Sequence, residues 1–475
     1  MISNAWCSVS SNRDWSPSDL RSRGLLRAIY PKAALDAAFC ALNEMTSPVH
    51  SGTSAVLGSL RHQRQAWAVL IGSTLAFTAS FMVWMVFGVI AIPIGRDLQL
   101  TATEIGVMMG VPILVGSLAR FPLGRWADDG NGRRLTLWLL ALTVPALWLL
   151  AYSSAYWQIL LAGGLMGFSG GVFAVGTPYV ARWFDPGRQG TAMGIFGCGN
   201  SGAALNQMIA PVLVVAFGWT VVPQVYSVFV LLAMLVFWLM SEEESPCPGP
   251  SPMNWRSQLR LLREPRILRY CQYYSVVFGG FVALSLWLVQ HYVGEYGLNI
   301  RNAALLAVLC TLPGALMRGL GGVLADRFGA HAVTWWVMWL SWICLFLLSY
   351  PSTDLTIRTN TGFLSLHVGL GVEAFTFLAI VLGVAWAFGR ASVFKYISQD
   401  YPDAIGSVTG VVSMVGGLAG FVLPVLFGFL LDLTGVRSSA FMLLYGWVWL
   451  SLIWIYWAEV RHTDVVRRPV PPAGE

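Results

Sequence analysis

The sequence predicts an all-α integral membrane protein with twelve transmembrane helices in two halves of six. Apolar residues make up 56% of the 475 residues and charged residues only 11%, which is more apolar surface than a soluble core of this length can bury. From Ala66 onward, apolar stretches of roughly 20 residues recur, the length that a helix needs to cross the hydrocarbon layer of a bilayer. A lipid bilayer is therefore the expected solvent for much of the surface.

The expected helices span approximately 66–94, 104–125, 134–152, 156–184, 190–217, 219–240, 267–291, 302–325, 331–350, 368–397, 406–432 and 437–458. The longest segment between them, 241–266, is rich in acidic residues and proline, and we interpret it as a cytoplasmic linker. It separates an N-terminal bundle (66–240) from a C-terminal bundle (267–458). We expect 1–65 to be a poorly ordered cytoplasmic extension and 459–475 to be a cytoplasmic tail, and no cleavable signal peptide is expected.

The distribution of basic residues predicts the orientation of the chain, because cytoplasmic loops retain Lys and Arg. One set of loops carries most of them, whereas the loops of the opposite set carry at most one each, namely Arg96, Arg301, Arg358 and Arg437. Both termini are therefore predicted to be cytoplasmic, in a multi-pass protein of the cell inner (plasma) membrane. The net charge of +6 is spread over these loops and forms no patch, so no nucleic-acid partner is expected.

Motifs for catalysis and cofactor binding are absent from the sequence. The seven cysteines form no CxxC pair and have no His at metal-ligand spacing. No GxxxxGK[ST] sequence indicates ATP-driven transport, and no serine nucleophile can be assembled with a base from a local motif. We expect no catalytic residues, no metal and no cofactor, and hence no enzyme.

An internal repeat relates the two halves. It consists of an Arg, a Gly and an Asp at intervals of four residues, at matching positions of the second and eighth expected helices: Arg120, Gly124 and Asp128, then Arg318, Gly322 and Asp326. Repeats of this kind are typical of alternating-access transporters, which place their sites between the halves.

The two repeated arginines predict an anionic substrate. An Arg near the centre of an apolar helix costs about 2.5 to 3.5 kcal/mol on insertion scales. Snorkelling to the interface explains a single such residue, but two at repeat-related positions favour a shared cavity. Two guanidinium groups facing one cavity repel each other unless an anion lies between them, and their planar forks of donors suit a planar oxyanion.

Two segments resemble the cytoplasmic loop motif of the major facilitator superfamily, namely GRWADDGNGRR (124–134) and GGVLADRFG (321–329). The first copy departs from the pattern because Gly132 comes one residue late. The resemblance implies the fold of that superfamily and a gating role for six residues: Gly124, Asp128, Arg133, Gly322, Asp326 and Arg327.

Within that superfamily, residues 66–458 resemble the nitrate/nitrite porters. The signatures are GGLMGFSGGVFAVGTPYVARWF (163–184), GIFGCGNSGAALNQMIAP (194–211) and GRASVFKYISQDYPDAIGSVTGVVSMVGGLAGFVLPVLFG (389–428). The resemblance implies transport of nitrate and/or nitrite, as an antiporter or a proton symporter. It also implies a binding site whose substrate arginines, aromatic packing residues and polar neighbours are Arg120 and Arg318, Phe173 and Phe278, and Tyr274 and Asn200.

Arg390 departs from the family pattern, which leads us to expect a small polar residue there. Three interpretations stay open: it lines the pathway as a third positive charge, pairs with Glu373, or lies at the helix end. With Lys395 it would also attract anions at the cytoplasmic side. Glu373 is the only plausible carboxylate for proton symport, and this scarcity slightly favours nitrate/nitrite exchange.

Two other functions compete with this one. Paired cationic residues also suit a carrier of a small carboxylate such as formate or oxalate. A non-transporting membrane sensor of anions is disfavoured, because neither terminal segment contains a recognisable output domain. We expect a monomer, since each chain contains both halves.

Overall fold

The computed structural model describes residues 52–127, 131–185, 188–243, 261–359, 362–401 and 405–460. The predicted N-terminal extension, linker and tail fall largely outside these ranges, as does Asp128. The chain divides into two compact units, Met1–Arg64 and Gln65–Glu475, and the second contains nearly all of the described helices.

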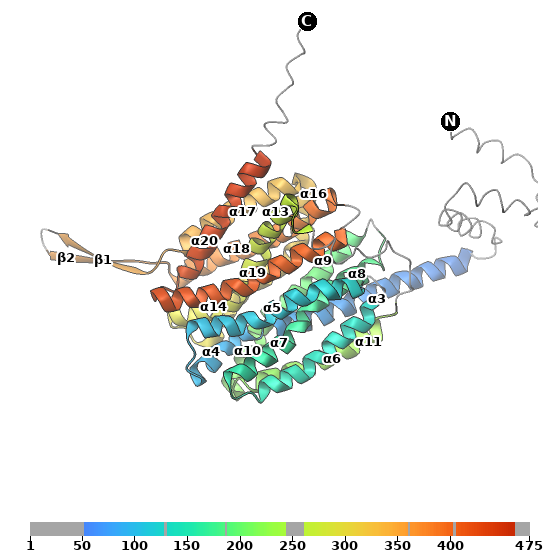
Figure 1. Cartoon of the computed structure of the whole chain (residues 1–475), viewed down its shortest axis with the longest axis horizontal. Helices are drawn as coiled ribbons and strands as arrows, with labels where there is room; N and C mark the ends of the chain where they lie inside the picture. The colour runs from blue at the N-terminus through green and yellow to red at the C-terminus, as the bar shows by residue number, and fades with distance from the viewer. Residues whose placement is uncertain are drawn as a thin grey trace, which may run out of the picture. The chain divides into compact units, whose positions relative to one another are not determined.

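Helices make up nearly all of this second unit (Figure 1). The first half consists of α3 (Gly52–Trp84), α4 (Phe87–Asp97), α5 (Ala102–Trp126), α6 (Gly132–Ala151), α7 (Tyr156–Gly167), α8 (Val172–Ala181), α9 (Gln189–Gly197), α10 (Gly202–Phe217) and α11 (Val221–Met240). The second half consists of α13 (Pro265–Tyr274), α14 (Gly280–Tyr296), α15 (Ile300–Leu316), α16 (Arg318–Phe328), α17 (Ala330–Leu348), α18 (Val372–Asp400), α19 (Ile405–Thr434) and α20 (Ser439–Ile455).

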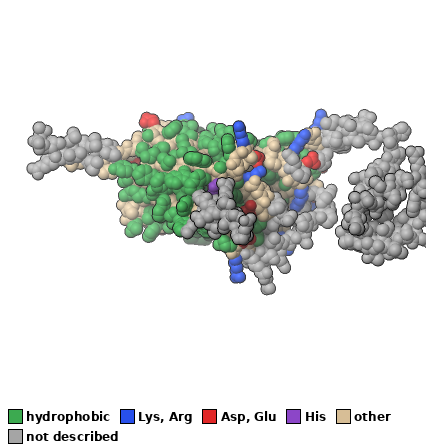
Figure 2. All heavy atoms as spheres, turned by 90° about the horizontal axis from the view of Figure 1, so that it is seen from above, with side chains coloured by type: hydrophobic (Ala, Val, Ile, Leu, Met, Phe, Trp, Pro, Cys, Tyr) green, Lys and Arg blue, Asp and Glu red, His purple; other side chains and the backbone are tan. Residues whose placement is uncertain are grey.

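Within the described ranges, 11 helical spans are long and apolar enough to cross a membrane, and the bent pair α15 and α16 makes up to 12. The prediction of an all-helical membrane protein with twelve spans is thereby confirmed in its main features. Large apolar side chains face outward on these helices, as Trp138 (74% exposed) and Trp336 (71% exposed) illustrate. Figure 2 shows hydrophobic side chains covering much of the visible face of the helical part.

Several spans are interrupted near their middle. The 3₁₀ turn Phe168–Gly171 joins α7 to α8, and the similar turn Cys198–Ser201 joins α9 to α10. A π-helical turn, Ser275–Gly279, joins α13 to α14, and α15 meets α16 at a bend of 46°. The sequence analysis treated each span as one regular helix. Glycines, which weaken regular helix, accompany most of these breaks.

A β-hairpin stands between α17 and α18, where the sequence analysis placed only a loop. Strand β1 (Thr353–Thr359) pairs in antiparallel fashion with β2 (Gly362–Val368), so that Thr353 lies opposite Val368. Strand β1 contains Thr and Ile, and β2 contains Phe and Val, all of which favour extended backbone.

The two halves meet most closely along α5 and α19, which run side by side (Figure 1). A Cβ added to Gly106 would lie 2.3 Å from the carbonyl oxygen of Pro424. Close to it, the Asp432 carboxylate accepts hydrogen bonds from the amides of Ala102 (3.0 Å) and Thr103 (2.7 Å). The N-terminal end of α5 is therefore capped by the opposite half.

Toward the other end of the same bundle, small residues have more room. Added Cβ atoms at Gly124, Gly190, Gly322 and Gly410 would meet nothing within 4 Å. The closest backbone packing on a glycine described for α5 and α19 therefore lies at the end that carries Ala102 and Asp432, although Gly194 of the first half also approaches Gly319 of the second, with an added Cβ 4.0 Å from its Cα.

Replacing Gly106 by Ala should destabilise the protein, because the new methyl group would collide with backbone that cannot rotate away. Overpacking of this kind typically costs about 1–3 kcal/mol. The measurement is thermal unfolding of the purified protein in detergent, followed by size-exclusion chromatography. Gly446→Ala is the matched control, since an added Cβ there meets nothing within 4 Å. Equal unfolding temperatures for the two variants would contradict the packing described for α5 and α19.

Candidate functional site

Arg120 lies in the membrane-spanning part of α5 and is only 2% exposed. Its Nε donates to the carbonyl of Gly170 (3.2 Å), in the 3₁₀ turn between α7 and α8. Its Nη1 donates to the carbonyl of Ser413 (3.3 Å), in α19 of the other half. Backbone carbonyls from both halves therefore replace part of the water that a buried guanidinium loses.

Aromatic rings surround the same guanidinium. Its central carbon lies 4.9 Å from the ring centroid of Trp84, 5.3 Å from that of Phe278 and 5.8 Å from that of Phe173. The ring faces attract the charge electrostatically. Trp84 is fixed in turn, because its Nε1 donates to the carbonyl of Pro112 (2.7 Å).

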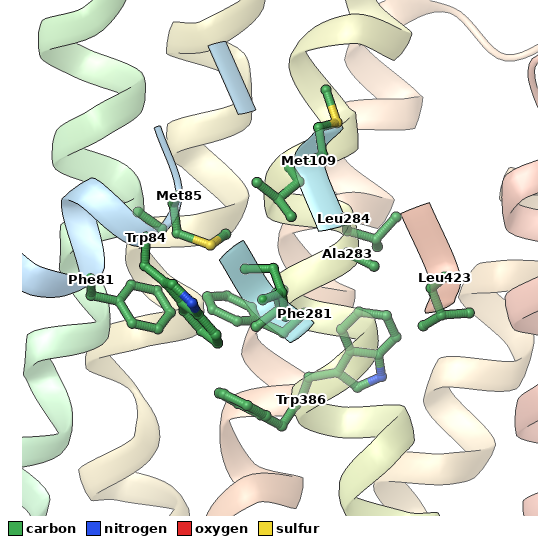
Figure 3. Close-up of a cluster of buried hydrophobic side chains, with 14 of the residues drawn as sticks. Phe81, Trp84, Met85, Met109, Phe281, Ala283, Leu284, Trp386 and Leu423 are labelled. Atoms are coloured by element: carbon green, nitrogen blue, oxygen red, sulfur yellow. The ribbon is translucent and has the colours of Figure 1, made fainter. Parts of the chain in front are cut away.

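Trp84 was missed by the sequence analysis. It is one of 22 tryptophans, and nothing in its sequence neighbourhood marks it, although it ends α3 just where the first span breaks. Figure 3 shows it among buried apolar side chains that include Phe81, Phe281 and Trp386.

Arg318 is the first residue of α16, directly after the 46° bend, and is half-buried. Its guanidinium carbon lies 5.0 Å from the ring centroid of Phe394 and 5.9 Å from that of Phe173. Within the part of the chain that the structure describes, this guanidinium has no hydrogen-bond or ion-pair partner. Arg318 therefore has fewer hydrogen-bond partners than Arg120 among the described residues.

Phe173 connects the two arginines. The guanidinium carbon of Arg120 lies 5.8 Å, and that of Arg318 5.9 Å, from the centroid of its ring. The two guanidinium carbons, one from each half, are therefore separated by no more than the sum of these two distances. The ring also stacks against Phe196, with centroids 6.0 Å apart.

Tyr274 directly precedes the π-helical turn of the seventh span, and Phe278 lies within that turn. Their rings stack with centroids 5.0 Å apart, so Tyr274 packs against a ring that lies beside Arg120. Tyr274 also meets Phe394 edge to face at 5.3 Å. These contacts bring Tyr274, Phe278 and Phe394 into one aromatic group beside both arginines.

Asn200 is buried, and its hydrogen bond is local. Its Nδ2 donates to the carbonyl of Gly197 (3.0 Å), within the break between α9 and α10. Gly197 in turn is close to Arg318, because a Cβ added there would lie 3.4 Å from Cδ of that arginine. Asn200 therefore stabilises the turn against which Arg318 packs.

The predicted gating residues take different positions. Arg133 ties the start of α6 to the end of α11, donating from Nε to Ser241 Oγ and from Nη2 to the Trp238 carbonyl, both at 3.0 Å. Arg327 lies over the ring of Phe328 at 5.5 Å. Gly124 and Gly322 face open space.

Asp326 pairs with Lys395, whose Nζ lies 2.6 Å from its carboxylate, and this ion pair joins α16 to α18. The Lys395 side chain is 33% exposed. Its positive charge is therefore balanced by Asp326, one of the predicted gating residues of the same half.

Two interpretations of Arg390 are wrong. Glu373 is exposed in the first turn of α18, and Arg390 follows 17 residues later in the same continuous helix, roughly 25 Å away at 1.5 Å per residue. The two cannot pair. Arg390 does not lie at a helix end either, because α18 runs on to Asp400 and the side chain is completely buried. Among the described residues, no Asp or Glu is buried.

Comparison with known proteins agrees with this architecture. The sequence profile of the Major Facilitator Superfamily matches residues 72–424. A protein of Thermus thermophilus named probable nitrate/nitrite antiporter NarK1 is 36% identical over 402 residues, 82% of this chain and 90% of the relative. The nitrite extrusion protein of Bacillus subtilis is 27% identical over 400 residues, 83% of this chain and 95% of the relative.

A solved structure shares the fold. It is a bacterial homologue of the human lysosomal transporter Spinster, in an inward-facing and unoccupied conformation, with a TM-score of 0.67 and 14% identity. The alignment covers 84% of this chain and 98% of that one.

The chain therefore belongs to the major facilitator superfamily and, within it, to the nitrate/nitrite porter family. It is a multi-pass membrane transporter and not an enzyme.

Exchanging the charges of Asp326 and Lys395 tests the gate. We expect Asp326→Asn and Lys395→Gln each to change the transport rate, because each leaves one charge unpaired at the junction of α16 and α18. The double variant Asp326→Lys, Lys395→Asp should recover most of the rate. The pair is partly exposed, so its contribution to stability should be small, about 0–1 kcal/mol. A double variant no better than either single change would contradict the pairing.

Proposed function

We propose that the protein carries nitrate and nitrite across the cell inner membrane by alternating access, with Arg120 and Arg318 as the substrate ligands. The observation that carries the proposal is that both guanidinium groups, one from each half, lie within 6 Å of the ring of Phe173, with no buried carboxylate among the described residues to neutralise them. An anion is the missing counter-charge. The names of the relatives indicate which anion.

The aromatic surroundings suit nitrate better than a strongly hydrated anion. Nitrate is flat, and its charge is spread over three oxygens, so ring faces and edges can replace its water at low cost. The rings of Phe173, Phe278 and Tyr274 would pack around it while the arginines donate to its oxygens. Asn200 would act on the site through the turn at Gly197.

The conformation fits one end state of a rocking transporter. The halves are packed tightly where Asp432 caps α5, whereas Gly124, Gly322 and Gly410 have open space. In the proposed orientation, with both termini cytoplasmic, the tight end is the outer one and the chain is inward-facing. The proposed gating residues among the described ones, Gly124, Arg133, Gly322, Asp326 and Arg327, would then lie at the cytoplasmic side.

Exchange of nitrate for nitrite is the favoured mode. Proton symport requires a group in the pathway that takes up and releases a proton, and Glu373 is exposed at the end of α18. Without an anion the site would return carrying uncompensated positive charge, which costs energy in the bilayer. The lipid bilayer is the only other partner we propose, and the working unit is the monomer.

Counterflow in proteoliposomes tests substrate and mode together. Vesicles loaded with nitrite or nitrate should take up labelled nitrate, and a pH gradient should change the rate little. Competition by excess formate or oxalate distinguishes a small-carboxylate carrier from a nitrate carrier. Uptake that requires an inward proton gradient, with no stimulation by internal anion, would exclude exchange.

Replacing Arg120 or Arg318 by Lys should abolish or severely reduce nitrate counterflow, although the protein still inserts. The positive charge persists, but the planar fork that can donate two parallel hydrogen bonds does not. Arg301→Lys is the matched control, since Arg301 is exposed at the start of α15. Near-normal kinetics in both test variants would exclude a two-arginine clamp.

A further inference from the structure

Arg390 is a third arginine inside the bundle. It lies in the interior of α18, and its side chain is completely buried. Only Arg120 among the other described arginines is buried to a comparable degree. Because a charged side chain at such depth is costly, its presence requires a compensating interaction.

Its contacts come from three helices of the second half. The guanidinium carbon lies 4.1 Å from the ring centroid of Phe281, in α14. Nε donates to the carbonyl of Trp386 (3.3 Å), and Nη2 donates to the carbonyl of Gly314, one turn before Arg318. These bonds hold the guanidinium in one place and leave it little freedom to reach toward a substrate.

The contacts do not neutralise its charge. Nη1 is buried and has no hydrogen-bond partner in the described part of the chain. Because Nη2 contacts the Gly314 carbonyl, one turn before Arg318 in the bent pair of helices, the two positive charges belong to the same part of the second half. Arg120, Arg318 and Arg390 thus bring three positive charges into the membrane-spanning helices of the described bundle, without a buried acid.

We propose that Arg390 is a positioning residue whose charge, acting through the field and without direct contact, sets the affinity of the transporter for its anion. The inference rests on the proposed function of the Arg120 and Arg318 site. Charges act over longer distances inside a protein than in water, because the surroundings screen them less. A charge fixed by backbone carbonyls beside Arg318 would draw an anion toward the clamp and keep it there.

Three substitutions separate charge from packing. Arg390→Lys keeps a positive charge and a donor, Arg390→Gln keeps a donor without charge, and Arg390→Met keeps neither. If the charge acts, Lys should leave the KM for nitrate within about threefold of the native value, whereas Gln and Met should both raise it about tenfold or more. The maximal rate should change less than the KM in all three.

Other roles predict other patterns. If Arg390 only holds the Gly314 carbonyl, Gln should recover much of what Met loses. If its fork grips the substrate directly, Lys should be as impaired as Met. Either pattern overturns the proposal. Because a buried ammonium can lose its proton, the Lys variant is measured at pH 6 and pH 8, and impairment at both values counts against the charge.

The experiment also distinguishes this inference from the function on which it rests. Each variant is first shown to be folded by size-exclusion chromatography, and KM is measured with whichever of nitrate, nitrite or formate the native protein transports. Native transport of formate alone would overturn the proposed substrate and leave the comparison of the three variants intact. Native transport of nitrate with an unchanged KM in the Gln and Met variants would overturn the role of Arg390 alone.

Discussion

The organisation of this protein depends on how positive charge is kept inside an apolar bundle. A guanidinium removed from water needs acceptors and polarisable surroundings. Arg120 obtains them from two backbone carbonyls and three aromatic rings, and none of these carries a negative charge. The solvation of the arginine is thus partly replaced, but its charge is not cancelled. An anion can complete the site in a way that a neutral solute cannot.

Interrupted helices supply two of the backbone acceptors of the buried arginines, whereas the carbonyls of Ser413 and Trp386 belong to the continuous helices α19 and α18. In an unbroken α-helix nearly every carbonyl is used within the helix, so few remain for a side chain from elsewhere. The 3₁₀ turn that contains Gly170 offers its carbonyl to Arg120, and the bend after Leu316 follows the Gly314 carbonyl that Arg390 uses. In a membrane, irregular backbone is tolerated where protein or a polar cavity satisfies it. Here the carbonyls of Gly170 and Gly314, at or near helix breaks, accept hydrogen bonds from the buried arginines.

The sequence predicted some of these features much better than others. Arg120 and Arg318 could be found because charge is expensive in lipid and because the repeat marks both positions. The aromatic residues Phe173, Phe278 and Tyr274 came only from a family resemblance, since core packing is the ordinary role of such side chains. Trp84 and Phe394 escaped notice because their importance depends on three-dimensional proximity to the arginines.

The helix breaks and the β-hairpin could not be predicted from the hydropathy pattern either. A window that averages over about 20 residues detects a span but not an interruption of one turn within it. Arg390 was noticed as a departure from the family pattern, yet two of its three interpretations failed. The length of α18 explains both failures. This one uninterrupted helix keeps Glu373 far from Arg390, and it continues to Asp400, well past Arg390.

The Arg120 contacts also connect binding with movement of the halves. Gly170 belongs to the first half and Ser413 to the second, so one guanidinium donates to both. Tight packing of α5 on α19 stabilises this arrangement. The backbones at Gly106 and Pro424 are already too close for the two helices to move nearer to each other. If the halves rock apart at this interface, Arg120 loses an acceptor that only water or an anion can replace. An anion bound between Arg120 and Arg318 would supply that acceptor while the halves remain apart. The energy barrier to rocking would then be lower for the protein with bound anion than for the empty protein. Under the proposed function, substrate binding and conformational exchange would depend on the same hydrogen-bond donors.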